Sequence, residues 1–166
     1  MSEYCVVVAE GARARFFTLE PAAVPELESG PNLQEHNSLA NPSHKAHQNK
    51  IFADTRSGRN RSTVAGAHGY DEHRSQHDDE MEHRFARDIA NELSNLTSAN
   101  GTRRVVLCAE KRMLGFLRGA LNGSIPNGVE VVEVAKDLAK LPARSLHERL
   151  AGQGLLPARR ARNAAG

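Results

Sequence analysis

Two arginines near the start of the chain, Arg13 and Arg15, are spaced so that they could act as a pair. They alternate with Ala12, Ala14 and Phe16 in a pattern typical of a β-strand, which places both side chains on one face of that strand. A guanidinium group presents a planar fork of N–H donors that suits bidentate contact with phosphate or carboxylate. The pair could therefore bind an anion, or it could be the solvated face of a hairpin.

Two further groups of arginines lie in segments that have no core pattern. One is in the polar stretch 40–76, and the other is in the basic tail 151–166. Flexible segments rich in Arg, Ser and Gly commonly bind the RNA backbone, although plain disorder explains them as well. The nearby aromatics, Phe52 and Tyr70, are too few to support base-specific recognition. The candidate RNA- or anion-binding residues are Arg13, Arg15, Arg56, Arg59, Arg61, Arg159, Arg160 and Arg162.

Three histidines, His73, His77 and His83, lie before or in the first turns of a predicted helix, among several acidic residues. His73 and His77 are four residues apart, a spacing that would place two potential metal ligands on one face of a helix. The spacing matches no established metal motif, and a solvated polar helix start explains it more simply. We therefore expect no resident metal ion and leave adventitious binding open.

No group of residues has the spacing of a catalytic site. Two-metal nuclease chemistry needs several carboxylates at one end of a sheet, whereas the opening strand contains none and Glu10 falls in the turn after it. Gly58, Gly66 and Gly69 are not followed by the Gly-Lys-Ser/Thr of a phosphate-binding loop. Neither cysteine has a base in a recognisable nucleophile arrangement. We therefore expect a protein without enzymatic activity, catalytic residues or cofactors.

Length and composition predict one folded domain with polar appendages. The chain has 166 residues, of which 39% are hydrophobic and 4% aromatic, and its formal net charge is +2. We place a single α/β domain at residues 1–150, with a long flexible insertion at about 40–76, and a disordered basic tail at 151–166. No apolar run reaches the roughly 18–20 residues of a membrane span, and Glu3 stands where a signal peptide carries positive charge. We therefore expect a cytoplasmic protein.

The opening stretch predicts the centre of a sheet. Residues 4–9 form an unbroken apolar run rich in β-branched residues, which suits a strand buried on both faces. Glu10-Gly11 fits a tight hairpin turn, and the alternation after it predicts a half-solvated second strand. Residues 33–39 predict a polar third strand at an edge. Cys5 and Cys108 fall in buried strands, where we expect small core residues rather than a disulfide.

Helices and strands then alternate along the chain. Met81, Phe85, Ile89 and Leu93 recur every four residues and predict a helix over residues 78–96. Further strands are predicted at 103–109 and 129–135, and further helices at 111–121 and 142–150. A strand, a crossover helix and another strand imply parallel pairing with the opening strand. The order β-β-β-α-β-α-β-α predicts an α/β fold with a mixed five-stranded, ribonuclease H-like sheet and helices on both faces.

The stretch Val-Val-Val-Ala-Glu-Gly-Ala-Arg-Ala-Arg-Phe-Phe at residues 6–17 resembles the opening signature of the bacterial host attachment protein family. The resemblance continues at residues 53–59, 82–93, 114–118 and 133–138, and covers residues 4 to about 150. This family is similar in fold to the middle domain of archaeal and eukaryotic peptide-release factors and to ribosomal proteins of that fold group. Release factors carry a Gly-Gly-Gln tip in an early loop, whereas Gly152-Gln153-Gly154 lies in the tail here. Peptidyl-tRNA hydrolysis is therefore not implied.

Two functions stay open. The basic segments and the resemblance favour a non-enzymatic cytoplasmic binding module that acts on structured RNA or the ribosome, in a role related to translation. The family name implies instead a protein-interaction factor required for attachment to host cells or surfaces. A hydrolase is the least favoured function, because the spacing supplies no converging carboxylates. The sequence predicts neither the partner nor the oligomeric state.

Overall fold

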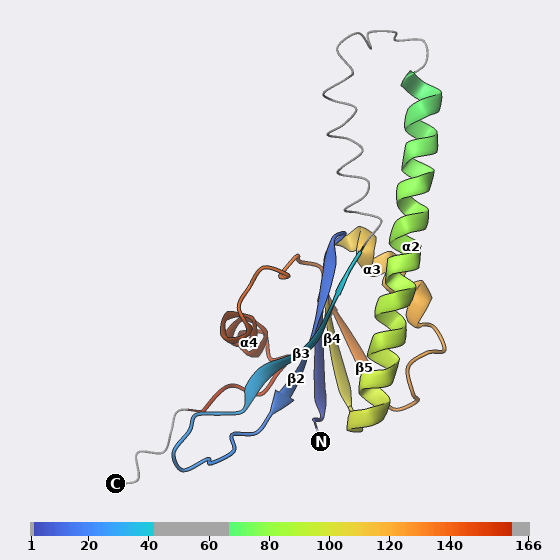
Figure 1. Ribbon diagram of the computed structural model, residues 1–166. Coiled ribbons are helices and arrows are strands. Elements are labelled where there is room, and N and C mark those ends of the chain that lie inside the picture. The colour runs from blue at the N-terminus through green and yellow to red at the C-terminus, as the bar shows by residue number, and fades with distance from the viewer. Residues whose placement is uncertain (1, 42–66, 161–166) are drawn as a thin grey trace.

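The computed structural model describes residues 2–41 and 67–160, with only the backbone of residues 67–75 (Figure 1). Within these residues the chain forms five strands and three helices, in the order that the hydrophobic pattern predicts. The elements are β1 (Tyr4–Ala9), β2 (Arg13–Glu20), β3 (Asn32–Ala40), α2 (Ala67–Asn100), β4 (Arg104–Cys108), α3 (Lys111–Leu121), β5 (Glu130–Val134) and α4 (Ala143–Gly152).

β1 is the central strand of a five-stranded sheet with the order β3-β2-β1-β4-β5 (Figure 1). It pairs antiparallel with β2, where Cys5 lies opposite Thr18, and parallel with β4, where Cys5 lies opposite Val105. β3 adds antiparallel to β2, and β5 adds parallel to β4. The sheet is mixed, as predicted, because a tight hairpin joins β1 to β2 whereas helical crossovers precede β4 and β5.

Alternate residues of β1 enter two separate hydrophobic cores. Cys5, Val7 and Ala9 pack with α2 and α3 on one face of the sheet, whereas Val6 and Val8 pack with α4 on the other. All five side chains are 0% exposed. Burying a valine fully stabilises the fold by roughly 1.5–3 kcal/mol. Helices therefore cover both faces of the sheet, which confirms the prediction (Figure 1).

β2 differs from the half-solvated strand that the alternation predicts, because both of its faces are covered. Ala14 and Phe16 belong to the core under α2, and Phe17 and Leu19 belong to the core under α4. The arginines that suggest a wet face occupy only the first half of the strand. After the arginines, Phe16 and Phe17 place apolar side chains on opposite faces, which is the pattern of a covered strand. β3 is the predicted polar edge strand, with residues 34–38 exposed.

α2 begins at Ala67, well before the predicted start at residue 78. Its buried stripe, which includes Phe85, Ile89 and Leu93, is the predicted one, but its first turns extend past the sheet (Figure 1). A helical segment beyond the sheet has no sheet core to face, so its sequence needs no apolar periodicity. Within the predicted insertion, residues 67–76 are therefore helical, and residues 42–66 lie outside the described residues.

Residues 153–160 pack against the domain, whereas the sequence predicts a disordered tail from residue 151. Leu156 is 5% exposed in the core beside α4. His147 Nε2 donates to the Pro157 carbonyl oxygen at 2.7 Å, and the backbones of Arg160 and Gly30 pair at N–O distances of 2.8 and 3.2 Å. These anchors outweigh the polar composition of the segment. Residues 161–166 lie outside the described residues.

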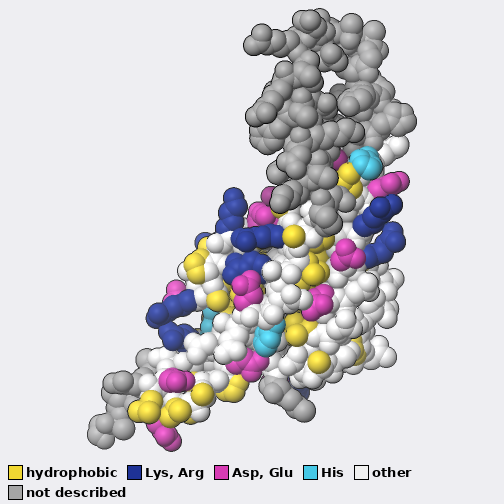
Figure 2. Space-filling model, viewed as in Figure 1, with side chains coloured by type: hydrophobic (Ala, Val, Ile, Leu, Met, Phe, Trp, Pro, Cys, Tyr) yellow, Lys and Arg dark blue, Asp and Glu magenta, His cyan; other side chains and the backbone are white. Residues whose placement is uncertain are grey.

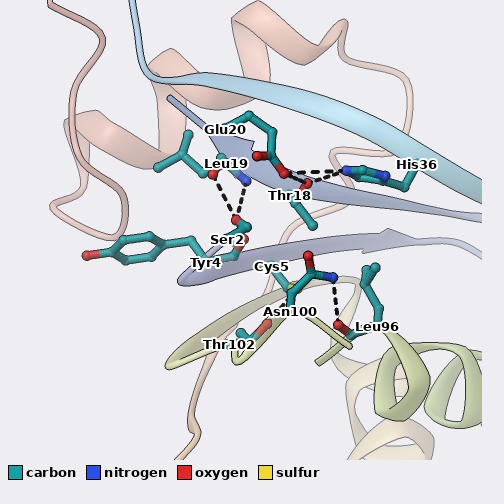
Figure 3. A network of polar contacts seen from close by, with 10 residues as sticks. All are labelled: Ser2, Tyr4, Cys5, Thr18, Leu19, Glu20, His36, Leu96, Asn100 and Thr102. Carbon is teal, nitrogen blue, oxygen red and sulfur yellow. Dashed lines mark hydrogen bonds and ion pairs between the residues drawn. The ribbon is translucent and has the colours of Figure 1, made fainter. Parts of the chain in front are cut away.

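A network of polar contacts closes the end of the sheet where β1 begins (Figure 3). Ser2 is 1% exposed, and its hydroxyl donates to the Leu19 carbonyl oxygen at 2.8 Å and accepts from the Leu19 N–H at 3.0 Å. The Cys5 thiol and the Thr102 hydroxyl lie 3.3 Å apart. Buried polar groups need such partners, and these contacts supply them for Ser2, Cys5 and Thr102 beside the start of β1.

We predict that neither thiol reacts with a chromogenic disulfide reagent at about pH 8 while the protein is folded. Cys5 and Cys108 are buried, and burial raises the pKa of both thiols, that of Cys108 to about 12, so the reactive thiolate is scarce. Absorbance should show labelling only as urea unfolds the chain. Labelling of the native protein at the rate of a free thiol would contradict this burial.

The same pKa shift gives a pH dependence of stability. The Cys108 thiol is protonated in both the folded and the unfolded chain below its ordinary pKa of 9.0, so its stabilising contribution is complete there. As the pH rises from 9.0 towards 12, the unfolded chain loses this proton first, and the free energy of unfolding should fall. Urea titrations across this range measure the fall, and a Cys108→Ala variant should reduce it.

Candidate functional site

The predicted arginine pair lies against the segment that joins β5 to α4. Arg15 Nη1 donates to the carbonyl oxygens of Ala139 and Leu141 at 3.0 and 2.7 Å. Arg15 Nε donates to Glu35 Oε1 at 2.5 Å, and Arg13 Nη2 donates to the Ala139 oxygen at 3.1 Å. The two guanidinium groups therefore fix this connecting segment onto β2 and β3.

The two arginines differ in how far they face solvent. The Arg15 side chain is 13% exposed, and its guanidinium carbon lies 4.9 Å from the centre of the Phe17 ring. A cation this enclosed needs partners, which the two carbonyl oxygens, the carboxylate and the ring supply. Arg13 is exposed. The carbonyl partners of Arg15 could not be predicted from local patterns, because they lie 124 and 126 residues further along the chain.

A cleft of about 450 Å³ opens beside the arginine pair, and we call it the first basic cleft. Arg13 and Arg15 line it together with Lys140, a cation that is not among the predicted binding residues. Glu35 adds one carboxylate to the same wall. Three cations against one carboxylate leave the cleft with a positive charge, although Arg15 directs part of that charge to the protein backbone.

A cleft of about 440 Å³ lies between α4 and the C-terminal segment, and we call it the second basic cleft. Its wall holds Arg144, Arg159 and Arg160 together with the carboxylate of Glu148. Arg159 Nε donates to Asn32 Oδ1 at 2.6 Å, and the backbone of Arg160 pairs with the connection between β2 and β3. The anchored C-terminal segment therefore places both of these predicted arginines.

Both basic clefts open beside α4, and together they form what we call the α4 face. Six cationic and two carboxylate side chains line it, a net charge of +4, whereas the whole chain carries +2. Figure 2 shows Lys and Arg side chains gathered on this side of the molecule, with single Asp and Glu side chains among them. Clustered positive charge attracts polyanions. The members of the face are Arg13, Arg15, Glu35, Lys140, Arg144, Glu148, Arg159 and Arg160.

The structure unites only part of the predicted basic set. Four of its residues line the α4 face, and the other four lie outside the described residues: Arg56, Arg59, Arg61 and Arg162. Lys140 and Arg144 complete the face, although neither is among the predicted binding residues. They flank the predicted start of the last helix, and only the folding of that helix over β3 reveals that they share a surface with Arg13.

Carboxylates line a third cleft, of about 350 Å³. Glu10 follows β1, Glu110 follows β4 and Asp137 follows β5. Because these three strands run parallel, the residues that follow them lie at the same end of the sheet. This convergence was not predicted from the sequence, because each of these carboxylates is alone in its own turn. Arg112 and Lys140 share the cleft. Among the residues that the structure describes, no three His, Cys, Asp or Glu side chains are placed to hold a metal ion.

The three histidines have different surroundings. His83 packs edge-on against Phe116, with the ring centres 4.3 Å apart, and so contributes to the contact between α2 and α3. His77 is exposed on α2. His73 lies one turn earlier on the same helix, and its side chain lies outside the described residues. His83 therefore helps to hold α2 against α3, whereas His77 faces solvent.

The mixed sheet and the α4 face define a small α/β protein with a locally basic surface. In the described part of the chain, no helix combines the length and the apolar character needed to cross a bilayer. Residues 5–150 match the model of a family described as "Protein required for attachment to host cells", and the chain belongs to this family. The resemblance of the opening stretch is thereby confirmed at the level of the family. No curated protein matches the chain.

We predict that Arg15→Ala lowers the free energy of unfolding by about 2–3 kcal/mol, because two carbonyl oxygens and a carboxylate lose their donor. Arg13→Ala removes a contact made by an exposed side chain and should cost less than about 1 kcal/mol. Urea unfolding followed by circular dichroism measures both variants. Equal losses would show that Arg15 does not fix the segment between β5 and α4.

Proposed function

We propose that the protein is a non-enzymatic binding module whose α4 face binds RNA through the phosphate backbone, on the ribosome or in another structured RNA. The observation that carries this proposal is the charge of the face, +4 against +2 for the whole chain. Lys and Arg side chains bind nucleic acid by neutralising phosphates and releasing counterions. A local excess of cations therefore matters more than the net charge of the chain.

The exposed cations suit contact with phosphates better than recognition of bases. The Arg144 side chain is 72% exposed, and its carboxylate neighbour Glu148 lies at 3.7 Å, which makes a weak surface pair. Lys140 and Arg160 are also exposed. Among the described residues that line the two basic clefts there is no Phe, Tyr or Trp on which bases could stack. The proposed binding is therefore largely independent of RNA sequence.

Fold-level analogy supports the same proposal, as an association only. We infer that the sheet is ribonuclease H-like, because three meandering strands precede two helical crossovers around a central opening strand. Similarity to the middle domain of peptide-release factors would then favour a cytoplasmic role in translation. Gly152-Gln153-Gly154 falls at the end of α4, where the chain turns into its anchored C-terminal segment. We therefore do not propose peptidyl-tRNA hydrolysis.

We predict that the purified protein binds a labelled single-stranded RNA of about 20 nucleotides, and that binding weakens steeply as salt rises. The double substitution Lys140→Ala and Arg144→Ala removes two exposed cations. It should weaken binding roughly ten-fold and reduce the slope of log K against log salt concentration by about 1.4. Fluorescence anisotropy at several salt concentrations measures both quantities.

The matched control is the double substitution Arg84→Ala and Arg87→Ala. This control removes two positive charges, as the Lys140→Ala and Arg144→Ala variant does. Both side chains are exposed on α2, which packs on the opposite face of the sheet from α4. This control should bind with the affinity and salt slope of the unaltered protein. Absence of binding at low salt, or equal losses in the two double variants, would overturn the proposal.

A second candidate function is a protein-interaction factor that supports attachment to host cells, and the family description favours it. Capture of partners from a cell lysate, with and without ribonuclease treatment, separates the two candidates. Partners that disappear after nuclease treatment support RNA binding. Protein partners that persist after nuclease treatment, and that bind equally well to the Lys140→Ala and Arg144→Ala variant, support the attachment factor instead.

A further inference from the structure

β5 forms one edge of the sheet, and within the described residues it pairs only with β4. On the β4 side, the Glu130 N–H donates to the Arg103 carbonyl oxygen at 2.9 Å, and the Val134 carbonyl oxygen accepts from the Ala109 N–H at 3.1 Å. Backbone groups of successive residues in a strand point to opposite sides, so Val131 and Glu133 direct theirs away from β4. This outer edge presents N–H and C=O groups that a further strand could pair with.

The opposite edge of the sheet is protected, whereas β5 is not. β3 is polar, and a bulge interrupts its register opposite Phe16 and Phe17. The backbone of Arg160 also pairs with Gly30, next to β3. Polar side chains, bulges and covering segments are the devices by which proteins prevent edge strands from pairing. β5 contains no proline or lysine, and its register against β4 is regular.

Both carboxylates of β5 are paired with arginines, so their charge would repel another strand only weakly. Glu130 pairs with Arg104 at 3.0 Å, and Glu133 forms a two-bond contact with Arg118 at 2.6 and 3.1 Å. Hydrogen bonding to Glu133 also raises the pKa of Arg118, so this pair stays charged and matched. The edge is therefore close to neutral, in contrast to the charged edges that keep sheets apart.

Apolar surface lies beside this edge. A groove of about 650 Å³ separates β5 from α3, and Val131 lines it with 39% of its surface exposed. The groove is open because α3 carries Gly115 and Gly119, where an added Cβ atom would meet no heavy atom within 4 Å. Unpaired backbone beside an exposed valine describes an edge that a further strand can extend.

We propose that β5 pairs antiparallel with β5 of a second copy of this chain, around a two-fold axis at Val132. In this register Val131 of each copy lies opposite Glu133 of the other, and the outward N–H and C=O groups of both residues are bonded. Glu130 lies opposite Val134. All five residues of β5 take part, and the two sheets join into one continuous sheet.

Self-complementarity selects a second copy over an unrelated peptide. The register at Val132 places no two carboxylates opposite each other, whereas an axis at Glu133 would oppose the two Glu133 side chains. An axis at Val131 would leave part of β5 without a partner. A two-fold interface requires one surface to match itself, and β5 does so in chemistry as well as in backbone pattern.

The dimer has a consequence for the α4 face, which rests on the proposed function. A two-fold axis perpendicular to the joined sheet keeps each face of the sheet on its own side. Both α4 faces therefore point in the same direction, and one polyanion could contact both. Two linked sites bind a long ligand more tightly than one site by avidity. The dimer itself depends only on β5 and stands without this consequence.

Sedimentation equilibrium of the full chain, freed of nucleic acid, tests the proposal. We expect twice the chain mass of 18.1 kDa at roughly 100 µM, with dissociation on dilution as mass action requires. Val131→Lys places a charge on the edge and should give the monomer mass at every concentration, with an unchanged circular dichroism spectrum. Gln34→Lys makes the same change of charge at the β3 edge and should leave the dimer intact.

A second variant guards against misfolding of the first. Val131→Pro removes an N–H that points away from β4, so the sheet should persist while the dimer is lost. A monomeric unaltered protein at roughly 100 µM, or a dimer that survives in folded Val131→Lys or Val131→Pro, would overturn the proposal. Since the measurement contains no RNA, failure to dimerise with RNA binding retained would leave the proposed function in place.

Discussion

One constraint organises the structure: β1 has no polar side chain between Cys5 and Ala9, so it must be covered on both faces. Because side chains alternate along a strand, the apolar run divides into two sets that need separate partners. α2 and α3 supply one layer, and α4 supplies the other. The position of α4 follows from this requirement, since without it Val6 and Val8 would lie open to water. The surface that α4 carries is thus a consequence of how the first strand is buried.

The α4 face owes its form to the same docking. Arg15 holds the connecting segment against β2 through the Ala139 and Leu141 carbonyl oxygens, and α4 begins at Ala143, directly after this segment. Lys140 lies in that segment and Arg144 follows it in the first turn of the helix, so both are carried to the surface next to Arg13. One arginine therefore stabilises the arrangement while its neighbours remain available to solvent. Stability and surface charge are coupled in this part of the molecule.

Local patterns were sufficient to predict most of the fold. The apolar run at β1 and the stripe through Phe85 and Ile89 predict a buried strand and a covering helix, because each pattern lies within one element. The hairpin after β1 is present, but its turn is centred on Gly11 and Ala12, one residue later than the predicted Glu10-Gly11. Features that depend on distant contacts were not predictable: the carbonyl partners of Arg15, the carboxylates that meet across three turns, and the anchoring of Leu156. The early start of α2 escaped prediction for another reason, because that part of the helix extends past the sheet.

The anchored C-terminal segment shows that the folding unit is longer than the stretch by which its family is recognised. The family match ends at residue 150, two residues before α4 does and ahead of Leu156. A recombinant fragment cut at that boundary would have a frayed last helix and would expose apolar side chains of the second core. Such a fragment would be expected to aggregate, and its behaviour would be wrongly ascribed to the family fold. Boundaries for expression are therefore better drawn beyond Arg160.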